Sequence, residues 1–367
     1  MATIRDVAER AGVAPSTVSF VMNGRPWVSE EVRKQVQVAV RELNYTQRQK
    51  GRPKKLAGNG KAAVRLKNQM ALLIPEALAT LRVYLTYLNV LHGVETTCSK
   101  LAKHMLLQTV TAAIPFKASA LASKIDGFIF MGDASPTTFS GLLGRVPAVR
   151  VMGVPEDGQP WDHVTYDNGR IGRLAAEYLL GRGHRHAAYL SPFAGIAPPQ
   201  LDPEHSFRGT PFHKINPGRQ QAFIETMEAA GAGVCVNPRG EAQWLPQHPE
   251  KLAALLRELL LTDPRPTGLF IPNDDVTKVA YEILPSLGIR PGVDIDIISC
   301  DNNTYLIGDL KPRPASIEIA TQSIGSRGVS VLLNRLENPD LPWSVTLLDP
   351  RIILGEGVWP AQAKAEN

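Results

Sequence analysis

The sequence predicts an N-terminal all-α head of the helix-turn-helix type, followed by an α/β body of two doubly wound parallel-sheet subdomains. Two patterns indicate this fold: three short helical segments precede residue 46, and strand-like and helix-like segments alternate after residue 69. A length of 367 residues is enough for two or three domains with cores of their own. We expect a head over residues 1–46, a basic linker over 47–68, a body over 69–358 and a tail over 359–367.

Each of the three head helices has its own start or stop signal. The first follows a capping box of Thr3 and Asp6 and extends to about residue 11, where Gly12 breaks it. The second begins at Pro15, whose missing N–H costs nothing at a first helical position, and extends to about residue 22. The third follows the cap candidate Ser29 and continues to about residue 43. This arrangement is typical of proteins whose second helix enters the major groove of DNA.

The positive charge is concentrated in the head and linker. Residues 1–67 hold 14 Lys/Arg against 5 Asp/Glu, a net charge of +9, while residues 68–367 hold 26 against 30, a net charge of −4. No acidic residue lies between Glu42 and Glu76. Such a stretch should neutralise DNA phosphates, so that binding weakens steeply with salt, although a solvated basic tail is the alternative. The linker cations are Arg48, Lys50, Arg52, Lys54, Lys55, Lys61, Arg65 and Lys67.

The alternation in the body predicts parallel sheets covered by helices, with a ligand cleft between two such units. We expect strands at residues 70–74, 104–109, 127–130, 148–151, 163–165, 187–190, 268–271, 296–299 and 316–317. Helical patterns lie between them, at residues 170–182, 219–230, 249–261, 276–287 and 324–336.

Several classes of function are disfavoured by the sequence. The first residues carry charges where a signal peptide needs an apolar core, and no apolar run is long enough to cross a membrane, so we expect a cytoplasmic protein. Cys98, Cys235 and Cys300 are far apart, which predicts reduced cysteines rather than disulfides or a zinc site. His184 and His186 lack a third ligand at useful spacing, so we expect no metal and no cofactor.

The head and body together resemble the lac repressor family of bacterial transcription regulators. In the head the matching motifs are T-I-x-D-V-A-x-x-A-G-V, T-V-S-x-V-x-N-G, V-S-x-x-x-R-x-x-V and E-L-N-Y. In the body, similar motifs occur at residues 126–129, 164–168, 183–185, 269–274 and 294–302. Because the resemblance covers nearly the whole chain, it implies a periplasmic-binding-protein-like effector domain. Its first subdomain would comprise residues 69–164 and 318–341, and its second residues 165–317 and 342–358.

The resemblance also implies a function. It predicts a nucleoid-associated bacterial repressor that binds a pseudo-palindromic DNA operator as a homodimer, under the control of a small sugar-like effector in the cleft between the subdomains. Two alternatives remain at this point. A solute-binding protein is disfavoured by the basic head, and an α/β enzyme would need a nucleophile–base pair that the sequence does not show.

Three positions in the second helix match the residues that contact DNA bases in the family. The resemblance assigns base recognition to Pro15, Ser16 and Phe20. Phe20 stands where many relatives have arginine, and its ring could pack on a thymine methyl group. Helix packing is the alternative for Phe20, although Val18 and Val21 already form the apolar face. The candidates for phosphate contacts are Thr3, Arg5, Thr17, Ser19, Asn23, Ser29 and Tyr45.

The linker departs from the family pattern. Relatives have a short hinge helix here whose leucine enters the minor groove, and Leu56 resembles that leucine. However, Gly51 and Pro53 disfavour a helix. The segment around Arg52 and Lys54 instead resembles the core of an AT-hook, in which arginine lies in a narrow A·T minor groove. We hypothesise minor-groove contact by Arg52, Lys54, Lys55 and Leu56; a solvated linker with phosphate contacts only is equally compatible.

Three polar residues match the effector-binding positions of the family. Arg219 could grip vicinal hydroxyls or a carboxylate with its planar fork, while Asn273 and Asp301 follow predicted strands, where open α/β sheets bind ligands. Asp274 is expected to cap the helix after it rather than contact ligand. Other segments depart from the family, notably residues 76–84, Met152-Gly153 and the Pro- and His-rich stretch 192–217. An effector other than a plain monosaccharide, or a degenerate site, therefore remains an alternative.

Overall fold

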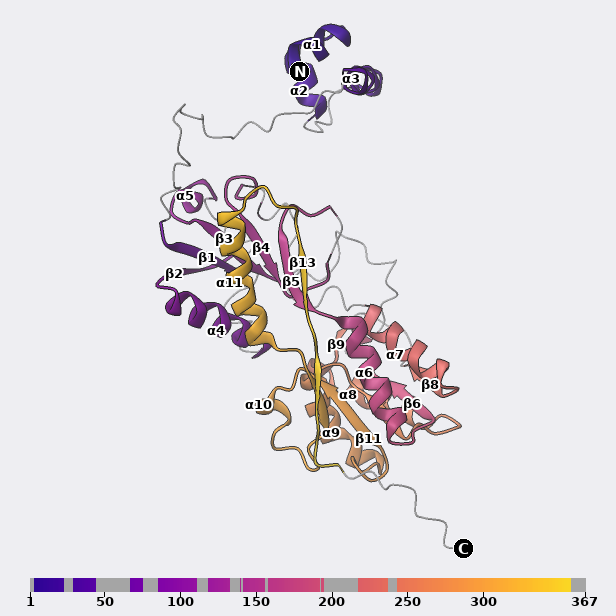
Figure 1. The fold of residues 1–367 in the computed structure, drawn as a ribbon. Helices are drawn as coiled ribbons and strands as arrows, with labels where there is room; N and C mark the ends of the chain where they lie inside the picture. Colours follow the sequence, from indigo (N-terminus) through magenta and orange to yellow (C-terminus); the bar gives the residue numbers. More distant parts are fainter. Residues whose placement is uncertain are drawn as a thin grey trace, which may run out of the picture. The chain divides into compact units, whose positions relative to one another are not determined.

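The computed structural model describes residues 3–22, 29–43, 67–74, 85–110, 118–132, 139, 141–155, 158–191, 193–194, 217–236 and 243–357. The chain divides into two compact units, Met1–Ala63 and Val64–Asn367. Figure 1 colours the elements of both units along the sequence.

The first unit contains a three-helix head. Its helices are α1 (Ile4–Arg10), α2 (Pro15–Met22) and α3 (Glu30–Glu42). The predicted capping box is present, since the Thr3 N–H donates to Asp6 Oδ2 at 2.7 Å and the Asp6 N–H donates to Thr3 Oγ1 at 3.4 Å. Gly12 turns the chain between α1 and α2 with a φ of +65°. The helix-turn-helix prediction is thus confirmed, with a core of Val7, Ala8, Val18, Val21, Val36 and Ala39.

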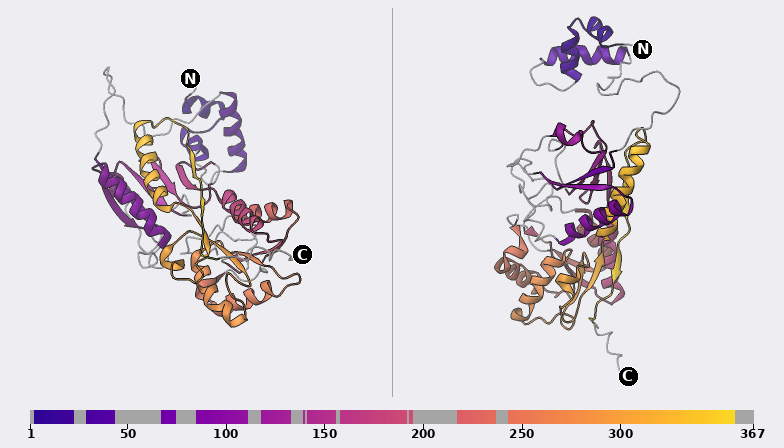
Figure 2. Two further views of the ribbon diagram at one scale, coloured as in Figure 1. Left: turned by 60° about the horizontal axis from the view of Figure 1, so that its bottom comes forward. Right: turned by 90° about the vertical axis from the view of Figure 1, so that its left-hand side faces the viewer.

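The first half of the body is a six-stranded parallel sheet in the order β13-β5-β4-β3-β1-β2. Helices α4 (Leu85–Lys100) and α11 (Thr321–Glu337) lie side by side on one face, and α5 (Ala118–Ala122) packs on the other (Figures 1 and 2). Both faces are covered, which explains why β1 is a continuous apolar run. The strands are β1 (Gln69–Ile74), β2 (His104–Thr109), β3 (Gly127–Met131), β4 (Ala148–Val151), β5 (Asp162–Tyr166) and β13 (Val345–Leu348).

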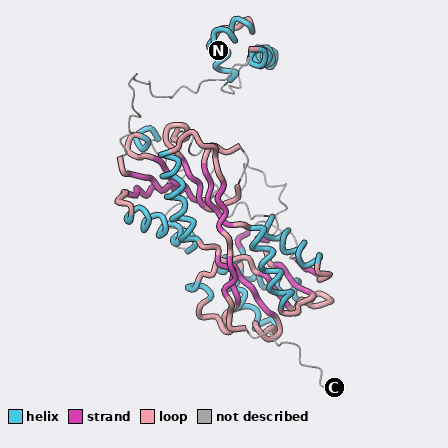
Figure 3. The backbone as a smooth tube through the Cα atoms, viewed as in Figure 1, coloured by secondary structure: helices cyan, strands magenta, loops and turns pink. Residues whose placement is uncertain are grey.

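The second half repeats this plan with the sheet order β14-β12-β11-β10-β6-β8, in which only β14 is antiparallel to its neighbour. One face carries α6 (Asn168–Gly181) and α7 (Pro217–Ala229), and the other carries α8 (Pro249–Leu260) and α9 (Asp274–Ile283). Figure 3 shows these strands and helices along the backbone. The strands are β6 (His186–Tyr189), β8 (Gly233–Val236), β10 (Gly268–Phe270), β11 (Asp296–Cys300), β12 (Ala315–Glu318) and β14 (Arg351–Ile353).

Smaller elements complete the second half. They are the two-stranded ribbon of β7 (Phe193–Ala194) and β9 (Gln243–Trp244), the short helix α10 (Thr304–Ile307), and the 3₁₀ turns η4 (Leu245–Gln247) and η5 (Leu284–Leu287). The fold class predicted from the sequence is confirmed for the described residues, and every strand that the sequence predicted is present. Five strands were not predicted: β7, β8, β9, β13 and β14.

The chain passes between the two sheets three times: after β5, after β12 and between β13 and β14. The third passage lies at residues 349–350, later than the residue 342 expected from the sequence, because β13 pairs with β5 of the first sheet. A buried ion pair holds the segment between α11 and β13 in place. Arg335 Nε lies 2.8 Å from Asp162 Oδ2, and Arg335 also donates to the carbonyls of Leu341 and Pro342.

Candidate functional site

Helix α2 supplies the residues that the sequence assigned to base recognition. Pro15 is exposed at its first position and Thr17 is half-buried, while Val18 and Val21 face the core of the head. α2 therefore packs on the head through the face that carries Val18 and Val21, which is compatible with a helix that enters a groove. The side chains of Ser16, Ser19 and Phe20 lie outside the described residues, as do Asn23, Tyr45, Arg52, Lys54, Lys55 and Leu56.

Two of the phosphate-contact candidates are helix caps in the structure. Thr3 Oγ1 accepts from the Asp6 N–H, and Ser29 Oγ accepts from the Val32 N–H at 3.4 Å. A hydroxyl that accepts in a cap keeps its hydrogen for donation to a phosphate oxygen. Both residues are exposed, and so is Arg5, so the structure is compatible with phosphate contacts by all three.

The end of the linker is fixed to the body by Lys67. Its backbone N–H donates to Asp126 Oδ1 at 2.8 Å, and its Nζ donates to the carbonyls of Ala122 and Ile125 at 3.1 and 3.0 Å. Asp126 Oδ2 also accepts from the Gln69 N–H at 3.3 Å. The Asp-Gly motif at the start of β3 therefore defines where the chain enters the body.

Arg219 lies on the first turn of α7 with its guanidinium tied to three other segments. Its Nε donates to Asn168 Oδ1 at 3.1 Å, and its Nη1 donates to the Pro272 carbonyl at 2.7 Å and contacts Cys300 Sγ at 3.5 Å. The guanidinium carbon also lies 5.6 Å from the centre of the Tyr166 ring. Arg219 is only 9% exposed, so its position is set by these contacts rather than by solvent.

Asn273 and Asp301 lie together at the carboxyl ends of β10 and β11. Asn273 Nδ2 donates to Asp301 Oδ2 at 3.0 Å, while Asn273 Oδ1 accepts from the N–H groups of Asp275 and Val276 and caps α9. Asp301 has a φ of +105°, a left-handed backbone that turns the chain out of β11. The structure therefore brings two of the predicted effector residues into direct contact, next to the strand ends where Arg219 donates to Pro272.

The prediction for Asp274 is wrong, because Asn273 caps the helix and Asp274 is fully buried beneath it. One Asp274 oxygen accepts from the Ser299 hydroxyl, and the other accepts from the Asn303 N–H at 2.6 Å. These bonds tie Asp274 to the residues on both sides of Asp301. Burial raises the pKa of Asp274 well above its ordinary value, and the Asp301 charge adds to this effect. Sequence reasoning missed this role, and Asn168 and Tyr166 as partners of Arg219, because they depend on tertiary packing.

Burial also raises the pKa of Asp301 to about 7; Arg219 opposes this and Asp275 reinforces it. A carboxyl with a raised pKa stabilises the fold most at low pH, and this contribution is lost as the pH rises through 7. We expect the free energy of unfolding of Asp301→Asn to rise by roughly 2–3 kcal/mol relative to that of wild type between pH 5 and pH 8. Denaturant unfolding at both pH values measures this gain. The exposed Asp309→Asn variant is the control, and an equal gain in both variants would contradict the assignment.

His184 and His186 do not converge. His184 is buried, with Nδ1 2.9 Å from Thr267 Oγ1 and Nε2 3.2 Å from Asp296 Oδ2, whereas His186 is exposed. Asp296 also accepts from Arg182 Nε. The Gly-His-Arg motif thus contributes a histidine that joins α6 to the sheet. Within the described ranges, no group of three or more His, Cys, Asp or Glu side chains could hold a metal ion.

Comparison with known proteins identifies the family. Residues 3–47 match the model of the bacterial regulatory proteins of the lacI family, and residues 176–358 match that of the periplasmic binding protein-like domain. The chain belongs to the lacI family. It is 27% identical to the HTH-type transcriptional repressor PurR of Proteus mirabilis over 96% of each chain. As lacI-family members are transcription regulators, the enzyme alternative is rejected, and the solute-binding alternative does not account for the head.

Solved structures of regulators share the fold of this lacI-family chain. The transcriptional regulator CelR in complex with cellobiose superposes with a TM-score of 0.60 at 23% identity, covering 98% of this chain and all of that one. The lac repressor dimer bound to operator and the anti-inducer ONPF gives a TM-score of 0.58 at 20% identity, with 97% and 98% covered. No helix in the described parts of the chain combines the length and apolar character needed to cross a membrane.

Proposed function

We propose that this lacI-family regulator is a repressor that binds a pseudo-palindromic operator as a homodimer. The observation that carries the proposal is a helix-turn-helix head whose second helix packs into the core through Val18 and Val21, joined by a basic linker to a two-sheet body. The solved lac repressor is a dimer on its operator, and this chain matches its fold over nearly the full length. We place the protein in the bacterial cytoplasm, at the nucleoid.

In the proposed complex with operator DNA, α2 lies in the major groove, with Pro15, Ser16 and Phe20 facing the bases. Thr3, Arg5, Thr17, Ser19, Asn23, Ser29 and Tyr45 contact phosphates, which fixes the register of the head. Arg52, supported by Lys54, Lys55 and Leu56, enters the minor groove at the operator centre. The domain limits are those predicted from the sequence, except that the first subdomain includes β13.

The effector is a small polyol, held by Arg219, Asn273 and Asp301. The support for this assignment is the Asn273–Asp301 hydrogen bond at the carboxyl ends of two neighbouring strands and the placement of Arg219 against the adjoining Pro272 carbonyl. Asp301 offers acceptor oxygens, and Asn273 and Arg219 offer donors, which together suit vicinal hydroxyl groups. The complex of the related CelR contains the sugar cellobiose. By linkage, an effector that weakens operator binding must itself bind less tightly to the operator-bound protein.

Replacing Phe20 with arginine tests the assignment of α2. Phenylalanine can pack only on apolar edges such as the thymine methyl, whereas arginine donates two hydrogen bonds to guanine. We expect Phe20→Arg to change the preferred base by about 1–3 kcal/mol at one position of each half-site, which sequencing of selected duplexes measures. Arg5→Gln should weaken binding to all sequences alike. An unchanged motif in the Phe20 variant would contradict base contact by this residue.

A further inference from the structure

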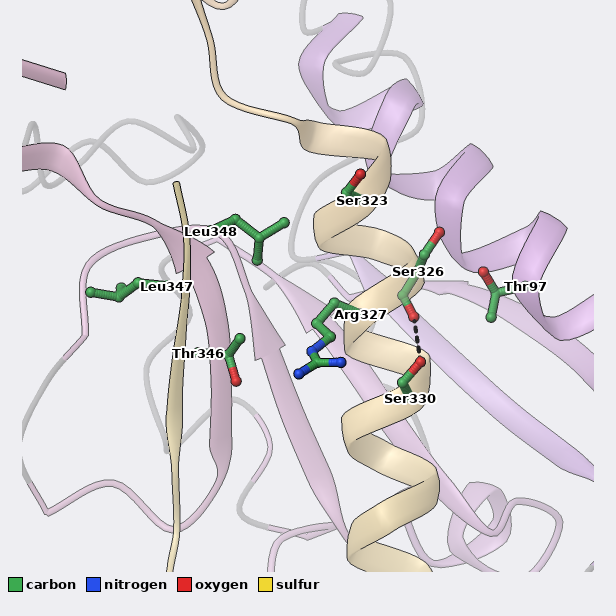
Figure 4. A pocket seen from close by; sticks show the side chains of 8 residues that line it. All are labelled: Thr97, Ser323, Ser326, Arg327, Ser330, Thr346, Leu347 and Leu348. Atoms are coloured by element: carbon green, nitrogen blue, oxygen red, sulfur yellow. Dashed lines mark hydrogen bonds between the residues drawn. The ribbon is translucent and has the colours of Figure 1, made fainter. Parts of the chain in front are cut away.

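An open surface pocket lies in the first half of the body, away from the effector residues. It has a volume of about 490 Å³ and is bordered by α4, α11 and β13 (Figure 4). Ser323, Ser326, Arg327 and Ser330 share one face of α11 at helical spacing. The described residues that line it, besides these four, are Thr97, Thr346, Leu347 and Leu348.

The positive charge of this pocket has no neutralising partner among the described residues. Arg327 makes no hydrogen bond or ion pair with them, and none of the eight lining residues is Asp or Glu. Figure 4 shows its side chain extending from α11 toward Thr346 of β13. A guanidinium in this position presents up to five N–H donors to an anionic group such as a phosphate or carboxylate.

The hydroxyls of the pocket divide into two kinds. Thr97 Oγ1 donates to the Gly93 carbonyl at 2.8 Å, Ser326 Oγ donates to the same carbonyl at 3.2 Å, and Ser330 Oγ donates to the Ser326 carbonyl at 3.2 Å. Since a hydroxyl has one hydrogen, these three groups offer only lone pairs to the pocket. Ser323 and Thr346 have no such bond to a described residue, and their O–H groups can donate.

A ligand that satisfies both kinds of group must be anionic and must also carry hydroxyl donors. Its anionic group would accept from Arg327 and Ser323, and its hydroxyls would donate to Ser326, Ser330 and Thr97. Leu347 and Leu348 add an apolar wall, and the volume is within the usual range for small-molecule sites.

We propose that this pocket binds a hydroxylated anion of the sugar-phosphate class, at a site separate from the effector cluster of Arg219, Asn273 and Asp301. Its position gives such a ligand an influence on the regulator. Ser323 is three residues beyond Ala320, where the chain enters α11 from the second sheet, and Leu348 is the last residue of β13 before the third passage. A ligand bound to both would join α11 to β13 and restrain two of the three passages between the sheets.

Calorimetric titration of the full-length protein with glucose 6-phosphate tests the proposal. We expect saturable binding, with at least tenfold weaker binding of glucose or inorganic phosphate alone. Arg327→Gln should weaken the binding of glucose 6-phosphate at least tenfold, while Arg173→Gln, which removes an exposed arginine from α6, should leave it unchanged. Ser330→Ala should weaken binding of the sugar phosphate but not of inorganic phosphate, because its lone pairs serve the sugar hydroxyls.

Three results would overturn the proposal. The first is an absence of saturable binding to the wild-type protein at millimolar glucose 6-phosphate. The second is equal binding by wild type and Arg327→Gln. The third is a loss of binding in Asn273→Ala with full binding in Arg327→Gln, which would place the ligand at the effector cluster. Circular dichroism of each variant verifies that it is folded.

Discussion

Replacing Arg335 with methionine should lower the free energy of unfolding by about 3–5 kcal/mol, because it leaves a buried carboxylate unpaired. The side chains of Arg335 and Asp162 are only 5% and 2% exposed. Arg335 Nη2 donates to Asp162 Oδ1 at 2.9 Å, and Arg335 Nε donates to Asp162 Oδ2 at 2.8 Å. The Ser344 N–H and hydroxyl also donate to Asp162 Oδ1, so the loss extends to the segment that leads into β13.

Denaturant unfolding of four proteins measures this effect: wild type, Arg335→Met, Asp162→Asn and the double variant. The double variant should be more stable than the sum of the two single losses predicts, since neither charge remains unpaired. Arg327→Met on the exposed side of the same helix is the matched control and should lose less than about 1 kcal/mol. A loss for Arg335 no larger than that of the control would contradict a structural ion pair.

Replacing Gly172 with alanine should destabilise the second half of the body by about 1–3 kcal/mol and displace Arg219. A Cβ on Gly172 would lie 2.1 Å from the Arg219 carbonyl oxygen and 2.9 Å from the Phe223 N, both backbone atoms of α7. Backbone atoms of a packed helix cannot move aside as a flexible side chain can, so the first turn of α7 must shift. Arg219 would then lose its hydrogen bonds to Asn168 and Pro272.

Gly181→Ala is the matched control, because a Cβ on this residue of α6 has nothing within 4 Å. It should remain within about 1 kcal/mol of wild type, since alanine favours helix more than glycine does. Unfolding measures the stability of both variants, and hydrogen exchange over residues 217–223 measures the displacement of α7. If both variants unfolded alike and α7 exchanged as in wild type, close packing of α6 on α7 would not position Arg219.

Local signals explain how much of the fold was predictable from the sequence. Pro15 and the capping box at Thr3 gave the starts of the first two helices, and apolar runs gave β1 and β4 closely. The edge strand β13 was missed because Val345 and Leu347 are about half exposed and Thr346 lies between them, so that the segment lacks a long apolar run. Its place is set by Asp162 and Arg335, which are 173 residues apart in the sequence.

The candidate site was predictable to a smaller extent. The family motifs predicted Asn273 and Asp301, and the structure brings these two residues into contact. They did not predict that Asn273 caps α9 while Asp274 is buried, because either residue type suits a helix cap. The hydrogen bond between Arg219 and Asn168 also depends on the packing of α6 against α7, which the sequence does not specify locally.

The most direct test of repressor function is the selection of bound duplexes from a random DNA pool by the purified full-length protein, at two salt concentrations. We predict a two-fold symmetric motif with an A·T-rich centre, and binding that falls steeply with salt because the head and linker carry a net charge of +9. Salt-sensitive binding without any enriched motif would contradict sequence-specific operator recognition and would make the head a non-specific anchor.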